Sequence, residues 1–148
     1  MHVIVATDGS QQSLVAVRDF MAFADTAKVH EVSVIAVVSP LATVPFANEL
    51  GGSEPDGPTE LSFREEAEAA TRVVMAEIEA WGSATVHRRV LSGSPALEIV
   101  RAAKQFGADL IVVSSGSGGL SDTILLGSTA QRVQHSAPCP VLVSRAKS

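Results

Sequence analysis

Residues 109–145, with the sequence DLIVVSSGSGGLSDTILLGSTAQRVQHSAPCPVLVSR, decide the fold class of this chain. A short run of β-branched residues is followed by serines and glycines, then by a helix start at Gly127-Ser128, then by a second β-branched run. Small residues beyond the carboxyl end of a strand allow backbone N–H groups to approach an anion, and the first amides of a helix lack partners within it. The layout therefore predicts an α/β fold with a phosphate-binding loop, and a nucleotide is the candidate ligand.

The same alternation of strand and helix extends over the whole chain. Runs rich in β-branched residues predict five strands, at residues 2–6, 32–38, 84–91, 109–113 and 140–144. Apolar residues at helical spacing predict three helices between them, over residues 14–24, 63–81 and 97–103, and a fourth helix should begin at Ser128. Capping-box patterns start at Ser62 and at Ser128. Alternating elements imply parallel strands joined by right-handed crossovers, hence an open doubly wound sheet with helices on both faces.

Composition agrees with this fold class and excludes several functions. The 148 residues fit one domain, 1–148, and 46% hydrophobic with only 4% aromatic residues is typical of a parallel sheet covered on both faces. The net charge of −5 and the scattered Lys and Arg residues argue against nucleic-acid binding. The chain has neither a secretory signal pattern nor a long apolar run, so we expect no membrane segment and a cytoplasmic protein. Cys139 is expected to be a small buried hydrophobe.

Sequence signatures of catalysis and of metal binding are missing. There is no Gly-Lys-Ser/Thr of a Walker loop, and Gly116-Ser117-Gly118-Gly119 lacks the dinucleotide-binding spacing. The chain has no Gly-x-Ser-x-Gly around Ser117, because Ser115 stands where the first glycine is required. The four histidines are not spaced as metal ligands. We therefore assign no catalytic residue and no metal site, and we expect a protein that is not an enzyme.

One long irregular stretch, residues 39–59, contains four prolines, three glycines and three acids. Such a loop is uncommon inside a compact domain unless it acts as a lid over a site or is disordered. A solvated connector between the second strand and the second helix is the alternative. We expect this loop to be the most mobile part of the chain and, under the first interpretation, to shield the site when a ligand is present.

Several motifs together resemble the universal stress protein family. They are ATDGS at residues 6–10, Gly93-x-Pro95, ADLIVVS at 108–114, LLGS at 125–128 and PCPVLVSR at 138–145. The resemblance covers essentially the whole chain. It implies a five-stranded Rossmann-like sheet of order 3-2-1-4-5 and a small cytoplasmic stress-response protein that dimerises through its C-terminal strand. Some members of the family bind ATP and others do not.

The resemblance also implies which residues hold the nucleotide. The adenine would lie near Val37 and Asp8, and the phosphates would lie at the Ser114–Gly119 loop and at the first amides of the last helix. The implied nucleotide-binding residues are Ala6, Thr7, Asp8, Val37, Ser114, Gly116, Ser117, Gly118, Gly119, Gly127, Ser128 and Thr129. Mg²⁺ is expected to offset the triphosphate charge, because no Lys or Arg lies in the loop.

Three of these residues also have a structural interpretation, and the Ser/Gly loop could be a flexible loop without a ligand. Asp8 would cap the first helix, Val37 would belong to the core, and Ser128 would cap the last helix. The family pattern has Gly, two residues, Gly, nine residues, then Gly-Ser. Counted back from Gly127-Ser128, its first two glycines fall on Ser114 and Ser117. Two hypotheses therefore stay open: an ATP-binding stress or signalling module, and a dimeric interaction protein with a degenerate site. A weak ATPase is a third.

Overall fold

The computed structural model describes residues 1–38, 60–116 and 128–145. In these ranges the chain forms, in order, β1 (His2–Ala6), α1 (Gln11–Phe23), β2 (Glu31–Val38), α3 (Glu60–Trp81), β3 (Thr85–Ser92), α4 (Pro95–Phe106), β4 (Leu110–Ser114), α5 (Ser128–Ser136) and β5 (Val141–Ser144). Every predicted strand is present, and each begins and ends within one residue of its expected position. The expected loop at residues 39–59 lies outside the described residues.

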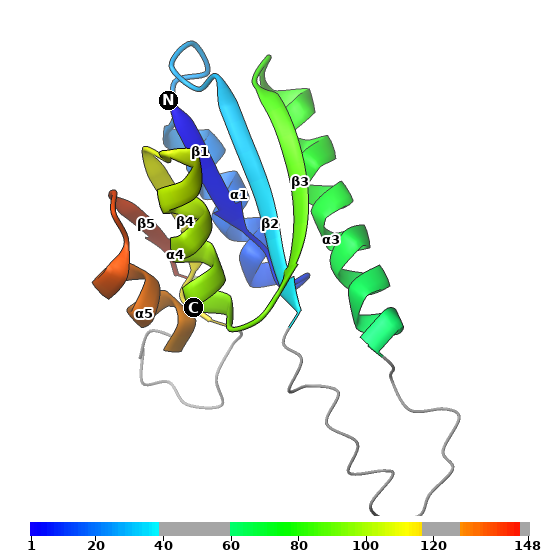
Figure 1. Ribbon diagram of the computed structural model, residues 1–148. Helices are drawn as coiled ribbons and strands as arrows, with labels where there is room; N and C mark the ends of the chain where they lie inside the picture. The colour runs from blue at the N-terminus through cyan, green and yellow to red at the C-terminus, as the bar shows by residue number, and fades with distance from the viewer. Residues whose placement is uncertain (39–59, 117–127, 146–148) are drawn as a thin grey trace, which may run out of the picture.

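The strands form one parallel sheet in the order β3-β2-β1-β4-β5, which confirms the predicted fold class and strand order. β1 lies in the middle, between β2 and β4 (Figure 1). From β1 the chain moves outward to β2 and β3, then crosses back to β4 and moves outward the other way to β5. The strand order therefore reverses between β1 and β4, and ligands of open parallel sheets bind beyond the carboxyl ends of the strands at such a point.

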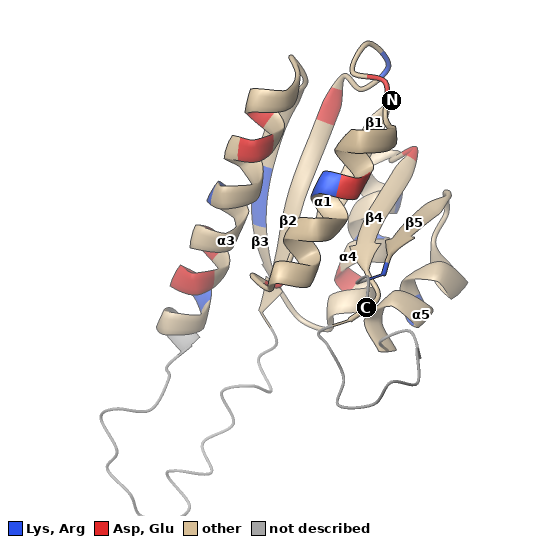
Figure 2. Ribbon diagram, turned by 180° about the vertical axis from the view of Figure 1, so that it is seen from behind, with Lys and Arg blue, Asp and Glu red and all other residues tan. Residues whose placement is uncertain are grey.

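Helices cover both faces of the sheet, as predicted. α1 and α3 lie on one face and α4 and α5 on the other (Figures 1 and 2). Alternate residues of β1 pack on opposite faces of the sheet. Val3 and Val5 lie in the core under α1 and α3, and Ile4 lies in the core under α4 and α5. On the first face Phe20 of α1 is 1% exposed and its ring centroid lies 5.6 Å from that of Trp81. Apart from Phe20, the buried residues of both layers are Val, Ile and Ala, as the low aromatic content indicates.

The helix starts show where local patterns were misleading. Asp8 does not cap α1: the cap is Ser10, whose side chain accepts a hydrogen bond from the Ser13 amide at 3.1 Å. Asp8 instead accepts from the Ser10 amide at 2.9 Å, within the turn that precedes the helix. α3 begins at Glu60, so Ser62 lies in its first turn and not at the cap position. Both patterns marked the right helix, but several polar residues near each start could serve as cap and only the backbone path selects one.

The other ends of the elements agree with expectation. Pro95 stands at the first turn of α4, where a proline needs no backbone partner. Ser128 is the first residue of α5, and His135 lies in its last turn. Asp109 precedes β4 and accepts a hydrogen bond from the His2 amide at 2.8 Å, which joins the two central strands at their amino ends. In the described ranges no helix is both long enough and apolar enough to cross a membrane.

Gly107 gives a direct test of the fold. It ends α4 with φ 62° and ψ 43°, and the Ala108 amide donates back to the Ala103 carbonyl at 3.0 Å, as in a Schellman motif. An added Cβ would meet nothing within 4 Å. The cost of Gly107→Ala is therefore purely conformational, and we expect a loss of about 1–2 kcal/mol in the free energy of unfolding by urea denaturation.

Gly82→Ala is the matched control. Gly82 has no positive φ, and an added Cβ would lie 3.4 Å from the Thr26 side chain, which is ordinary contact. We expect this variant to unfold within about 0.5 kcal/mol of the parent protein. Equal destabilisation by the two substitutions would contradict the assignment of Gly107 as a left-handed cap.

Candidate functional site

The turn between β1 and α1 lies at the carboxyl edge of the sheet and is held by its own hydrogen bonds. The Thr7 amide donates to the Ile35 carbonyl at 2.9 Å, which extends the pairing of β1 with β2 by one residue. The Thr7 hydroxyl lies 2.9 Å from the Ser13 hydroxyl and accepts from the Gly9 amide at 3.1 Å. Gly9 has a φ of +82°, which glycine adopts without strain. The turn therefore presents the exposed Asp8 side chain from a fixed backbone.

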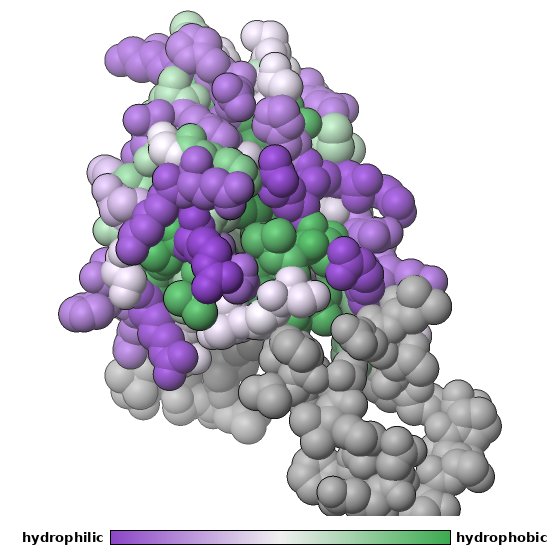
Figure 3. Space-filling view, in the orientation of Figure 1, coloured by the Kyte–Doolittle hydropathy of each residue, from purple (hydrophilic) through white to green (hydrophobic). Residues whose placement is uncertain are grey.

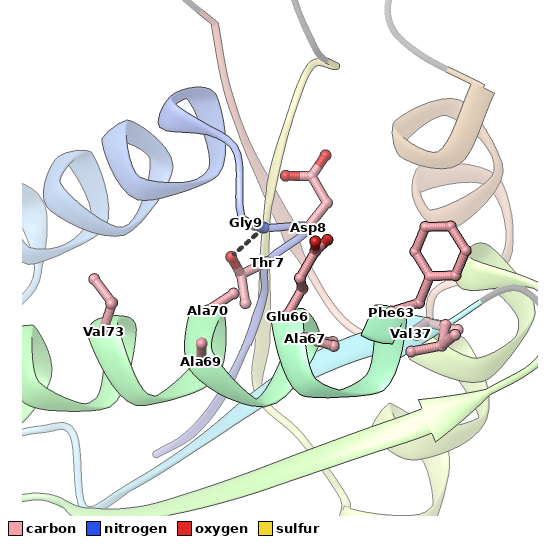
Figure 4. A pocket seen from close by; sticks show the side chains of 12 residues that line it. Thr7, Asp8, Gly9, Val37, Phe63, Glu66, Ala67, Ala69, Ala70 and Val73 are labelled. Carbon is pink, nitrogen blue, oxygen red and sulfur yellow. Dashed lines mark hydrogen bonds between the residues drawn. The ribbon is translucent and has the colours of Figure 1, made fainter. Parts of the chain in front are cut away.

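A pocket of about 540 Å³ opens beside this turn, between β1, β2 and the first half of α3. Its volume is within the range of roughly 300–1,000 Å³ that is usual for small-molecule sites. Thr7, Asp8 and Gly9 line one side, Val37 lies at the end of β2, and Phe63, Ala67, Ala70 and Val73 come from α3 (Figure 4). The structure thus brings together three of the predicted residues, Thr7, Asp8 and Val37.

The walls of the pocket differ in polarity. Figure 4 shows the Phe63 ring close to Val37 at one end of the pocket, with the alanines of α3 along its floor. The carboxylates of Asp8 and Glu66 lie on its open side. No lysine or arginine is among the described residues that line it. The pocket therefore suits a flat apolar group with hydroxyl or amino substituents, and it repels a phosphate.

A second set of predicted residues lies at the ends of β4 and α5. Ser114 ends β4 and pairs with Ser144, and the Ser115 amide donates to the Ser144 carbonyl at 2.8 Å. Gly116 then adopts a φ of +126°. Ser128 and Thr129 occupy the first turn of α5, a nine-residue helix. Because its first amides have no partner within the helix and carry its positive dipole end, this turn favours an anion.

Ser114, one of the two serines that stand where the family pattern has glycine, lies in the described part of the chain. Ser114 ends a regular strand, and no non-glycine residue in the described part of the chain has a positive φ. A serine at this position therefore has no conformational cost. The positive φ falls two residues later, on Gly116.

Some predicted residues do not join the pocket. Ala6 packs against the core on the α4 and α5 side of the sheet and does not line it. Ser114, Gly116, Ser128 and Thr129 do not line it either. The remaining predicted residues, Ser117, Gly118, Gly119 and Gly127, lie outside the described residues.

Sequence analysis missed the contribution of α3 to this pocket. Gly9 was adjacent to a predicted residue, and its position in a turn after a strand could have indicated it. Phe63 and Glu66 had no such signal. Their helix shows a regular apolar spacing, but which side of it faces the β1 turn depends on how α3 packs on β2 and β3.

Cys139 has the character expected of a structural residue. Its side chain is half-buried and packs against the core under α4 and α5. Burial raises the pKa of this thiol, and the negative charge of Asp109 raises it further. The thiol therefore stays protonated at neutral pH and is a poor nucleophile.

Comparison with known proteins gives one consistent result. Residues 1–145 match the Universal stress protein family. Universal stress protein MJ0531 from Methanocaldococcus jannaschii is 38% identical over 147 residues, which cover 95% of this chain and 79% of that protein.

Solved structures agree with this match. The structure of MJ0577, described as a test case of function assignment from structure, superimposes with a TM-score of 0.77 and 29% identity, over 99% of this chain and 96% of the other. A universal stress protein in complex with cAMP has a TM-score of 0.70 and 24% identity, over 99% and 98% of the two chains. The strand order, the motifs and these matches lead to the same conclusion: the chain belongs to the universal stress protein family.

Proposed function

We propose that this chain is a stress-response or signalling module that binds an adenine nucleotide, with ATP as the first candidate. The observation that supports this most is the pocket in which Asp8 and Val37, the two residues expected beside the adenine, lie together. The structurally similar universal stress protein in complex with cAMP binds a ligand with an adenine base. No catalytic role is part of the proposal, and the cytoplasmic location stays a prediction.

The pocket and the end of α5 suit different parts of such a ligand. The apolar end near Val37 and Phe63 fits a purine ring, and the carboxylates of Asp8 and Glu66 can accept hydrogen bonds from ribose hydroxyls or from the adenine amino group. A phosphate about 4 Å from such a carboxylate would be repelled by about 4 kcal/mol near a protein surface. The phosphates therefore belong outside the pocket, at Gly116 and the first amides of α5.

This division of the site also bears on magnesium. No lysine or arginine lines the pocket among the described residues, so backbone amides are the main source of positive potential for the phosphates. Mg²⁺ would neutralise part of the triphosphate charge. We therefore propose that ATP binds as its magnesium complex and that its affinity is modest.

Two other functions remain open to test. A dimeric interaction protein with an empty degenerate site would show no response to nucleotide. A weak ATPase would release phosphate above background, and Asp8→Asn would abolish the release.

Nucleotide binding is tested by filling the pocket from α3. Ala67 lines the pocket and is half-buried, so Ala67→Phe places a ring where the purine would lie. We expect the parent protein to gain about 2.7 kcal/mol of stability at an ATP concentration 100 times its dissociation constant, with Mg²⁺ present. The Ala67→Phe variant should lose most of this gain, measured by thermal shift and calorimetry.

Ala76→Phe is the control on the same helix. Ala76 is exposed and does not line the pocket, so this variant should bind ATP like the parent protein. If the parent protein gives neither heat nor thermal shift at millimolar ATP with Mg²⁺, the interaction-protein hypothesis replaces the nucleotide site. Equal loss in both variants would show that the effect is not at the pocket.

We also propose a homodimer that pairs through β5. This strand lies at the edge of the sheet and pairs with β4 on one side. The Pro140 carbonyl accepts a hydrogen bond from the Ile111 amide of β4, and the Ser144 carbonyl accepts one from the Ser115 amide just beyond β4. The alternate residues Val141 and Val143 therefore direct their backbone groups to the open edge. An edge of this kind favours pairing with another strand.

Removing one outward backbone donor tests the dimer. Val141 is the first residue of β5, where a proline is tolerated in a folded strand. We expect light scattering to give a dimer mass for the parent protein at micromolar concentration and a shift toward monomer for Val141→Pro. Circular dichroism should show that the variant stays folded. A monomer mass for the parent protein would disprove the proposal.

A further inference from the structure

A groove that is separate from the pocket beside Asp8 lies between α4 and α5, on the face of the sheet opposite to α1 and α3. Its volume is about 680 Å³, and it shares no lining residue with the pocket beside Asp8. Its lining includes Ala96, Leu97, Val100, Lys104, Arg132 and His135, together with three uncharged polar residues. Figure 3 shows this face of the molecule, where hydrophobic surface lies among hydrophilic side chains over α4 and α5. The proposed nucleotide site makes no use of this groove.

The floor of the groove is apolar. Ala96 and Val100 are 5% and 6% exposed, and Leu97 beside them is 54% exposed. A single exposed leucine is common on protein surfaces. Here it lies in a concave surface along a helix, next to buried residues of the same helix. The groove can therefore bury one row of apolar side chains from a partner.

The rim of the groove is positively charged. Lys104 comes from α4, Arg132 and His135 come from α5, and no acidic residue is among the described residues that line it. The one acid of α4, Glu98, is paired with Arg101 at 3.0 Å, and an added Cβ at Gly93 would lie 2.9 Å from its carboxylate oxygen. It is thus held toward the start of the helix, away from Lys104.

This charge contrasts with the rest of the molecule. The chain has a net charge of −5, and α3 on the opposite face contains six glutamates and two arginines. A basic rim around an apolar floor is complementary to a helix with one apolar side and flanking acids. Helices of that kind bind in grooves through apolar residues at spacings of three and four.

We propose that the groove between α4 and α5 is a docking site for an acidic amphipathic helix of a partner protein. Leu97 and Val100 contact its apolar side, and Lys104 and Arg132 face its acids. The charges set the orientation and the rate of association, and the apolar floor supplies the burial. Nucleic acid fits this groove less well, because its floor is aliphatic and no Phe, Tyr or Trp is among the described residues that line it.

The test uses a designed peptide as the probe. A fluorescein-labelled peptide of about 16 residues carries leucine at helical spacing on one side and glutamate beside it, and a second peptide replaces every glutamate by lysine. We expect fluorescence polarisation to show binding of the acidic peptide to the full chain, weakening as salt is added. The lysine peptide should not bind.

Charge reversal at the groove supplies the decisive variants. Lys104→Glu with Arg132→Glu should weaken binding of the acidic peptide by about tenfold or more, and Leu97→Ser should weaken it without changing its salt dependence. The control is Arg64→Glu with Arg72→Glu on α3, which makes the same change in net charge on the other face. It should bind within about twofold of the parent protein. All variants should keep the circular dichroism spectrum of the parent protein.

Three results would overturn the proposal. One is equal weakening by the α3 control, which would mean that binding follows net charge alone. Another is no binding of the acidic peptide at about 1 mM. The third is a changed sedimentation coefficient of the unliganded groove variant, which would assign the groove to a contact between copies of this chain.

Discussion

The central position of β1 is the constraint on which the rest of the structure depends. This strand pairs in parallel with β2 on one edge and with β4 on the other, and Val3, Ile4 and Val5 are each 0% exposed. Because neighbouring strands cover both edges of β1 and helices cover both faces, the chain can leave this strand only beyond its carboxyl end. The turn that follows it therefore emerges where the chain order reverses, and this places Asp8 at a crevice between two diverging halves of the sheet.

The crevice is completed by elements that are distant in the sequence. α3 supplies Phe63, Glu66 and a row of alanines, and their small size keeps the helix close to the β1 turn without filling the space. A Cβ at Gly9 would lie 3.5 Å from the Cβ of Ala70, so the turn and the helix are in near contact there. The ends of β4 and α5 lie on the other side of β1. A ligand that used both parts of the site would have to extend across the end of β1.

The distribution of charge separates the two candidate binding surfaces. Most charged residues of α3 are acidic, and the charged residues of the pocket beside it are Asp8 and Glu66. The groove between α4 and α5 carries Lys104, Arg132 and His135 instead. The sheet lies between them and shares its buried residues with both helix layers. Ligands at the carboxyl edge and partners at the outer groove would therefore contact the same domain without competing for a residue.

The sequence by itself determined the class of fold, the order of the strands through the family resemblance, and most element boundaries. It could do so because β-branched runs, helical spacing and glycine turns are local signals. It also placed Asp8, Val37 and Ser128 near the right strand and helix ends. Only the tertiary structure decided that Ser10 and not Asp8 caps α1, that Glu66 faces the pocket, and that Lys104 and Arg132 share one groove. The physical reason is that these relations depend on how each helix is rotated and set against the sheet, and packing between distant segments controls that rotation.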